Sequence, residues 1–362
     1  MGDFESLALY IFIALISTAF FSLYKSTYKL LRRLGLVMSV IIPAIFAGVR
    51  FNVGTDYPNY YWTFEHLKGV SFNWIITNPT HFNMDRGFLL ISKILSIGFS
   101  SKAIFGIWGA IILCLLVSTL YKQYKEYDIG LIFFSFLLLY YFNSFNILRQ
   151  VVAASIVFFS LKYVFEGKIV RFLLCVAIAA SFHFSALLAI PIWFLWNHKA
   201  NKTIGITKKW TVLLVAFAFA TLWQRLLQYL TVFNIASIIK YSEYLSGNDH
   251  SNTSFLVKLA LTVIFFLLQT YLQRGDEKIG FFILLFAVGM IIDYTGYYSS
   301  FVKRSAMYYS MGETILFSRF IYLVNDRSKV MAKGIVVALI LIYFTLSAFV
   351  LKQGGLIPYN YL

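Results

Sequence analysis

Apolar stretches of about 20 residues, the length that a helix needs to cross the hydrocarbon core of a bilayer, follow one another along the chain. Short segments that carry most of the Lys and Arg residues separate these stretches. The candidate spans are 6–24, 34–50, 103–121, 129–145, 148–165, 210–230, 255–272, 279–293, 305–323 and 333–351. Charged residues make up only 13% of the 362 positions, whereas about a quarter of the residues are charged in a soluble domain. The sequence therefore predicts an all-α polytopic membrane protein.

A further apolar stretch, 170–196, is interrupted at 181–184 by Ser-Phe-His-Phe. It is either one long kinked helix or two short spans that turn tightly at His183. Lys and Arg are enriched in cytoplasmic loops, and this bias decides between the two. With the N-terminus outside and a hairpin at 170–196, eighteen Lys and Arg lie inside and eleven outside, whereas a single span would move the cluster at 199–209 outside. We therefore predict about twelve spans in a single transmembrane domain of residues 1–362.

Two longer loops lie outside in this topology, at about 51–102 and 231–254. The first contains a 14-residue apolar run at 87–100. That run is too short to cross the bilayer comfortably, so it predicts a re-entrant or interfacial segment.

Arginines on the predicted outer side run against the cytoplasmic bias of positive charge. The formal net charge of +16 is spread between apolar blocks, so we interpret it as topology signals and expect no nucleic-acid partner. Arg50 ends the second span, Arg149 lies in a turn between spans, Arg304 begins the eleventh span, and Arg319 lies within that span. A guanidinium binds phosphate oxygens in bidentate fashion, so we predict that these four arginines bind pyrophosphate. Alternatively, each arginine reaches lipid headgroups or pairs with one carboxylate.

Asp56 and His183 are the candidate catalytic bases on the outer side. Asp56 lies in Gly54-Thr55-Asp56-Tyr57-Pro58, which has the composition of a turn whose side chains bond nearby amides. An imidazole ordinarily titrates close to neutral pH, which suits a base at the hairpin tip. The plainer alternatives are a loop anchor for Asp56 and a packing residue for His183. No metal or nucleotide motif occurs in the sequence, so we predict neither a metal nor a cofactor.

Several segments together resemble one protein family. VGTDYPNYY at 53–61 follows an arginine at the end of the second span, and the other segments follow it in the same order as in the family. They are DRGFLLISKIL at 85–95, FNILRQVVAASI at 145–156, ASFHFSALLAIPIW at 180–193 and KRSAMYY at 303–309. The combination resembles the EpsG family, polymerases of the Wzy type that build bacterial O-antigens, capsules and exopolysaccharides. The chain departs from the expected pattern at Asp85, where the family would have Glu.

The resemblance implies a glycosyltransferase of GT-C-type fold in the bacterial inner membrane, with its active site facing the periplasm. Its substrate would be an undecaprenyl-pyrophosphate-linked oligosaccharide, with a chain-length regulator protein as a further candidate partner. The enzyme would transfer the growing glycan from its lipid pyrophosphate to a new lipid-linked repeat unit, without a metal. The predicted glycan-binding residues are Thr55, Tyr57, Tyr60 and Gln150. Anchoring at the membrane interface explains the tyrosines equally well.

Three other activities fit a strongly hydrophobic chain with arginines on its predicted outer side. A lipid-linked glycan flippase would line a cavity through the membrane depth with its cations instead of gathering them at one face. An O-antigen ligase shares the lipid-pyrophosphate chemistry and differs in its acceptor. A membrane O-acyltransferase that uses cytoplasmic acyl-CoA would place its His and polar residues in the inner half of the spans.

Overall fold

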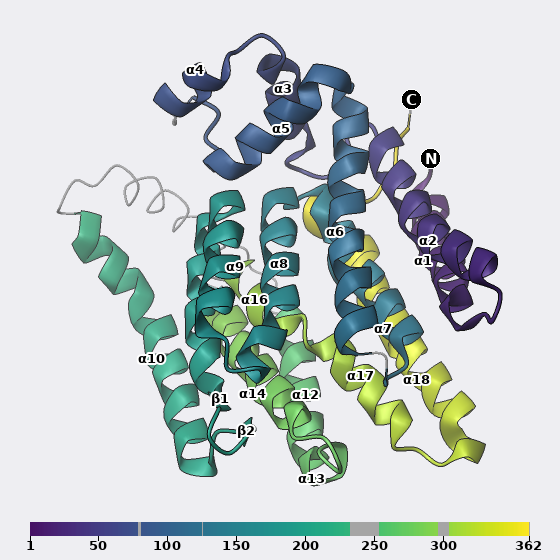
Figure 1. Ribbon diagram of the computed structural model, residues 1–362, viewed down its shortest axis with the longest axis vertical. Coiled ribbons are helices and arrows are strands. Elements are labelled where there is room, and N and C mark those ends of the chain that lie inside the picture. Colours follow the sequence, from purple (N-terminus) through teal and green to yellow (C-terminus); the bar gives the residue numbers. More distant parts are fainter. Residues whose placement is uncertain (79–80, 125, 232–252, 296–303, 362) are drawn as a thin grey trace. The chain divides into compact units, whose positions relative to one another are not determined.

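The computed structural model describes residues 1–78, 81–124, 126–231, 253–295 and 304–361, and helices dominate it (Figure 1). The elements up to residue 145 are α1 (Asp3–Ser22), η1 (Leu23–Lys25), α2 (Lys29–Val49), α3 (Tyr57–Leu67), α4 (Phe72–Thr77), α5 (Arg86–Gly98), α6 (Ser101–Gln123), α7 (Ile129–Phe136), η2 (Leu137–Tyr141) and η3 (Phe142–Phe145). Those that follow, up to residue 231, are α8 (Leu148–Phe165), α9 (Ile169–Phe182), η4 (Phe184–Leu195), β1 (Trp196–Asn197), β2 (Lys202–Thr203) and α10 (Ile206–Thr231). The remainder are α12 (Thr253–Leu267), α13 (Gln269–Leu272), α14 (Lys278–Thr295), α16 (Met307–Ser310), α17 (Glu313–Tyr322), α18 (Asp326–Phe344), η6 (Thr345–Val350) and η7 (Gln353–Gly355).

The chain forms two compact units, and neither is one continuous stretch of sequence. Unit 1 contains residues 1–160, 174–187 and 317–362, and unit 2 contains residues 161–173 and 188–316. The motifs at 53–61, 85–95 and 145–156 belong to unit 1, whereas Arg304 belongs to unit 2. The prediction of a single transmembrane domain stays a prediction.

Five helices among the described residues have the length and apolar composition to cross a membrane. They cover residues 3–25, 29–49, 101–123, 148–165 and 326–350. Shorter apolar helices occupy most of the other predicted spans, among them 129–145, 169–182 and 184–195. The helical membrane fold is therefore confirmed, while the number of twelve spans and the GT-C likeness stay predictions. The predicted outside loop at 231–254 lies almost wholly outside the described residues.

The predicted break in the stretch 170–196 is present at His183, between α9 and η4. The rings of Phe172 and Trp193 lie 5.8 Å apart. In one continuous helix these residues would be separated by roughly 30 Å, at about 1.5 Å per residue. The chain therefore reverses direction at His183, as the Lys and Arg distribution predicts. After η4, a short antiparallel pair of strands joins Trp196 to Thr203, a feature that the all-α prediction lacks.

The region between α2 and α6 folds into three short helices, α3, α4 and α5. Figure 1 shows α3 and α5 beside the end of α6 at which Ser101 lies. Helix α5 buries Phe88 and Leu89 and leaves Ile94 and Ile97 57% and 70% exposed. With only 13 residues and one buried face, α5 fits the predicted interfacial segment.

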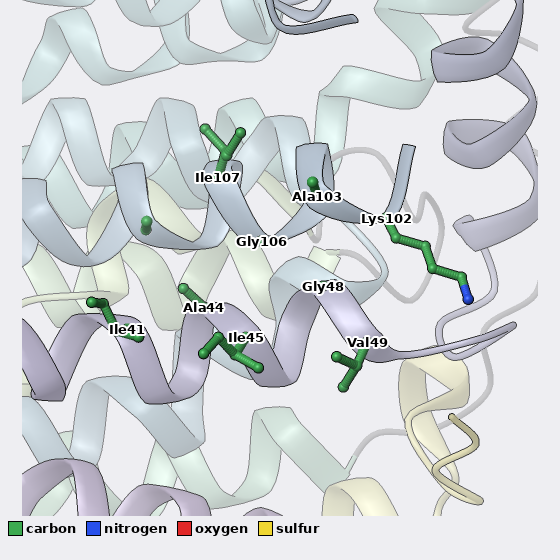
Figure 2. A pocket seen from close by; sticks show the side chains of 10 residues that line it. Ile41, Ala44, Ile45, Gly48, Val49, Lys102, Ala103, Gly106 and Ile107 are labelled. Atoms are coloured by element: carbon green, nitrogen blue, oxygen red, sulfur yellow. The ribbon is translucent and has the colours of Figure 1, made fainter. Parts of the chain in front are cut away.

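Helices α2 and α6 pack closely because small residues face each other. A Cβ atom added at Gly106 would lie 2.9 Å from the carbonyl oxygen of Ala44, and one at Gly48 would lie 3.3 Å from that of Lys102. The exposed edge of this contact is an apolar groove, with the Lys102 side chain at one end (Figure 2). The groove fits a surface that lipid chains cover.

The topology predicts which exposed residues face outward. In a variant whose two cysteines, Cys114 and Cys175, are replaced by serine, a cysteine at Asn59 should react with an impermeant thiol reagent in intact spheroplasts. A cysteine at Asn201 should react only after the membrane is opened. Both positions are exposed in the structure, so burial would not explain protection. Labelling at position 201 in intact spheroplasts would contradict the N-out topology.

Candidate functional site

Four segments distant in sequence meet at one end of unit 1, and each contributes one ionisable side chain. Asp56 precedes α3, Asp85 precedes α5, Arg149 lies in the first turn of α8, and His183 lies between α9 and η4. Figure 1 shows α3 and α5 beyond one end of α8 and beside one end of α6. Each of the four lies in one of the segments that resemble the family. Asp56, Arg149 and His183 were predicted as site residues, whereas Asp85 was not.

The Asp85 carboxylate is the centre of the cluster. Its Oδ2 accepts a hydrogen bond of 2.7 Å from Nη1 of Arg149 and lies 3.6 Å from Nδ1 of His183. Its Oδ1 accepts a hydrogen bond of 3.3 Å from the backbone N–H of Phe184. About a fifth of each of the three side chains is exposed, so the cluster is partly desolvated yet open to a ligand.

The charges around Asp85 keep it ionised. Burial alone would raise the pKa of its carboxyl group, but the interactions with His183 and with the positive charge of Arg149 outweigh burial and lower the pKa below its ordinary value. Asp85 is therefore a fixed negative charge that can orient both the guanidinium and the imidazole.

Close packing of α5 on α9 sets the distance between Asp85 and His183. A Cβ atom at Gly87 would lie 2.3 Å from Oγ of Ser181, so only glycine allows the two helices this close. Trp108 of α6 stacks on Phe88 at 4.9 Å and meets the edge of Phe182 at 5.7 Å. These aromatic contacts hold the start of α5 against the end of α9.

Tyr60 and Asp56 border Arg149 on the side of α3. The Tyr60 hydroxyl accepts a hydrogen bond of 3.4 Å from the backbone N–H of Arg149. Burial raises the pKa of Tyr60, with Arg149 acting in the opposite direction, so the phenol stays protonated at neutral pH. The Asp56 carboxylate acts electrostatically on both Tyr60 and Arg149. Asp56 is thus part of the same electrostatic site.

Asn146 connects the Asp56 loop to the Arg149 turn. Its Oδ1 accepts hydrogen bonds from Oγ1 of Thr55 at 2.5 Å and from the backbone N–H of Asp56 at 3.1 Å. Asn146 is three residues before Arg149, so these bonds tie the two segments together directly.

Arg50 is buried next to this loop, with 1% of its surface exposed. Its guanidinium lies 4.3 Å from the ring centre of Phe105 and 4.2 Å from that of Phe145, and its Nη1 donates to the carbonyl oxygen of Ala47 at 2.8 Å. Its Nε and Nη2 are buried without a hydrogen bond. A pyrophosphate could touch this guanidinium only if the surrounding rings moved.

The other two predicted arginines are not brought into the cluster. Arg319 lies beside Ser318, whose hydroxyl bonds the carbonyl oxygen of Asp128 at the start of α7. The helix from 129 to 145 runs from there toward the Arg149 turn and is roughly 25 Å long, which places Arg319 at the opposite end of unit 1. Arg304 is exposed and belongs to unit 2.

The predicted glycan-binding residues are mostly buried. Tyr57 and Tyr60 are each 3% exposed, and Tyr57 stacks on Phe105 at 4.9 Å. Gln150 is also 3% exposed, whereas Thr55 is exposed. The structure therefore leaves neither tyrosine with an open ring face for a sugar. Across the described residues, no three His, Cys, Asp or Glu side chains are grouped to hold a metal ion, and metal independence stays a prediction.

Sequence reasoning missed the roles of Asp85 and Asn146. The signal for Asp85 was an acidic residue directly before an apolar helix in one of the recognised segments. For Asn146 it was an asparagine in the turn Phe-Asn-Ser-Phe-Asn, between two predicted spans. Neither signal tells which distant segment the side chain bonds.

A sequence profile described as the EpsG family matches residues 33–361, which is nearly the whole chain. The match includes every member of the cluster around Asp85. No curated protein and no solved structure matches the chain.

Proposed function

The chain belongs to the EpsG family, and we propose that it polymerises undecaprenyl-pyrophosphate-linked oligosaccharide repeat units into a surface polysaccharide at the periplasmic face. Membership of the family supports a membrane protein of polysaccharide synthesis. The observation that carries the finer proposal is the partly exposed cluster in which Asp85 holds Arg149 and lies beside His183.

Arg149 is proposed to bind the pyrophosphate of the donor. Its side chain is 21% exposed and lies at the N-terminus of α8, where the helix dipole also favours an anion. Pyrophosphate is already a good leaving group, so the main electrostatic task is to stabilise the charge that develops as it departs. A guanidinium fixed by Asp85 does this without having to reorganise.

His183 is proposed to take the proton of the acceptor hydroxyl. Asp85 lies on the Nδ1 side of the ring, so a proton on Nδ1 makes Nε2 the nitrogen that accepts another. The acceptor oxygen forms a bond to the anomeric carbon of the donor sugar while the bond from that carbon to the phosphate oxygen breaks. The pyrophosphate leaves with the bonding electron pair beside Arg149, and the proton passes to His183. Asp56 is the second candidate for the base, since it borders the same arginine.

Arg50 is proposed to act by organising the outer loop, because aromatic rings enclose its guanidinium. The exposed hydroxyl of Thr55 is proposed to contact the glycan at the edge of the site.

Deletion of the gene in its native bacterium distinguishes this function from the alternatives. Loss of a polymerase should leave surface lipid capped with single repeat units, because export and ligation continue. Loss of a flippase would leave repeat units on the inner leaflet, and loss of a ligase would leave finished polymer on the undecaprenyl carrier. Either of these last two results would contradict the proposal.

A further inference from the structure

The last described residues of the chain, 353–361, form an irregular segment that we call the C-terminal strap. The strap packs against the N-terminal helices. Tyr359 is 1% exposed, its ring stacks on Phe46 at 4.3 Å, and its hydroxyl donates to the carbonyl oxygen of Phe46 at 2.7 Å. Its backbone N–H donates to Oγ of Ser6 at 2.9 Å, and Tyr10 donates to the carbonyl oxygen of Leu356 at 3.0 Å. The strap is therefore a fixed part of unit 1.

The strap also bonds the backbone of the loop that carries Asp56. The N–H of Gly54 donates to the carbonyl oxygen of Gly355 at 2.9 Å, and the N–H of Thr55 donates to that of Gly354 at 3.1 Å. Earlier in the loop, the N–H of Phe51 donates to the carbonyl oxygen of Asn360 at 2.8 Å. Three successive contacts thus hold residues 51–55 along the strap.

The same loop is held on its other side by the Arg149 turn. Asn146 accepts from Thr55 and from the N–H of Asp56, as described above. Gly54 has a φ of +94°, and a Cβ atom there would lie 2.1 Å from the carbonyl oxygen of Phe145. The loop is therefore sandwiched between the strap and the turn that leads into Arg149.

We propose that the C-terminal strap is a positioning element of the transfer site, which presses the Gly54–Asp56 loop against the Arg149 turn. This inference rests on the proposed function for its catalytic consequence, but the contact itself is tested separately below. The strap bonds the backbone of Phe51, Gly54 and Thr55, so it acts on Asp56 through the loop. Its removal from the loop would let Asp56 and Thr55 move away from Arg149.

Two neighbouring glycines provide a matched pair of variants. Gly354 and Gly355 have φ values of +71° and +62°, so alanine strains the backbone at both positions. A Cβ atom at Gly355 would lie 3.1 Å from Cγ2 of Thr55, whereas one at Gly354 would come no closer than 3.5 Å to Asn146. Gly355→Ala therefore displaces the loop in addition to straining the strap, and Gly354→Ala strains the strap alone.

The test compares purified full-length variants in proteoliposomes that contain a lipid-linked repeat unit. Gly355→Ala should lower kcat by about tenfold to a hundredfold, with little change in KM, because misplacing a site by about 1 Å costs this much. Gly354→Ala should lower kcat clearly less than Gly355→Ala, because its Cβ atom would meet no atom of the Asp56 loop. Thr55→Ser removes Cγ2 and keeps the hydroxyl, so it should restore part of the lost kcat when combined with Gly355→Ala. A structural defect would not respond to that second change.

Hydrogen exchange provides a readout that does not depend on activity. Peptides covering 51–57 should exchange faster in Gly355→Ala than in Gly354→Ala, while those covering 86–95 stay unchanged. The proposal is overturned if the two alanine variants behave alike in exchange, or if Thr55→Ser fails to rescue. If the wild type does not polymerise but the exchange difference is present, the proposed function fails and the positioning contact stands.

Discussion

Arg149→Ala should reduce kcat for polymerisation by about a thousandfold, with the protein still inserted in the membrane. The guanidinium is the one predicted pyrophosphate ligand that the structure places, partly exposed, in the Asp85 cluster. Removing one preorganised donor to a developing charge typically costs about 10²- to 10³-fold, and here the charge is that of a departing pyrophosphate. Arg149→Lys should recover little activity, because an ammonium cannot bond both Asp85 and a phosphate in the same fork geometry. The rate of glycan transfer by purified protein measures both variants.

Arg33→Ala is the matched control, since Arg33 is exposed and lies in a predicted inside loop. It should polymerise at the wild-type rate. Long polysaccharide ladders from Arg149→Ala would contradict the account, because they would make Arg149 a lipid anchor without a role in the transfer.

Asp85→Asn should lower kcat by at least about a hundredfold. In a Ser-His-Asp triad, replacing the carboxylate that orients the histidine by an amide costs about 10⁴-fold in kcat. The amide keeps the shape of the side chain but loses the charge that holds Arg149 and attracts a proton on His183. Because the pKa of Asp85 is lowered, its ion pair persists above the ordinary pKa of about 4 and is lost only as pH falls through the lowered value. Asp85 therefore stays charged at every pH from 5 to 8, and its own titration should add no pH dependence to the loss in Asp85→Asn over that range.

Asp85→Glu separates charge from geometry, because the family pattern would have Glu at this position. It should retain more activity than Asp85→Asn. Glu166→Gln is the control, because Glu166 forms an exposed pair with Lys168 at 2.7 Å and exposed pairs contribute little. Equal activity of Asp85→Asn and wild type would remove Asp85 from the mechanism.

Local sequence signals predicted the elements well and the side-chain environments poorly. Hydrophobic length and the Lys and Arg bias placed the helices and the reversal at His183, because both are properties of short segments. The segments that meet at Asp85 were recognised one by one. That Asp85 joins Arg149 and His183 depends on the close approach of α5 to α9 at Gly87, and such a tertiary contact is invisible in one sequence.

The arginines illustrate the same limit. Position along a span predicted that Arg50 would lie near the outer face, but not that Phe105 and Phe145 would enclose it. Arg319 was included because an arginine inside a span is costly and so suggests a function. The structure places it at the end of unit 1 opposite Arg149, where its guanidinium lies 5.1 Å from the ring centre of Tyr322.

The most direct test of the central claim counts the products of one purified protein. Wild-type protein in proteoliposomes would receive only the undecaprenyl-pyrophosphate-linked repeat unit, and the released lipid pyrophosphate would be counted against the new glycosidic bonds. We expect one lipid pyrophosphate to be released for each bond formed, and both products to fall together in Arg149→Ala. Movement of the lipid-linked glycan between leaflets without new bonds or released lipid pyrophosphate would contradict this expectation.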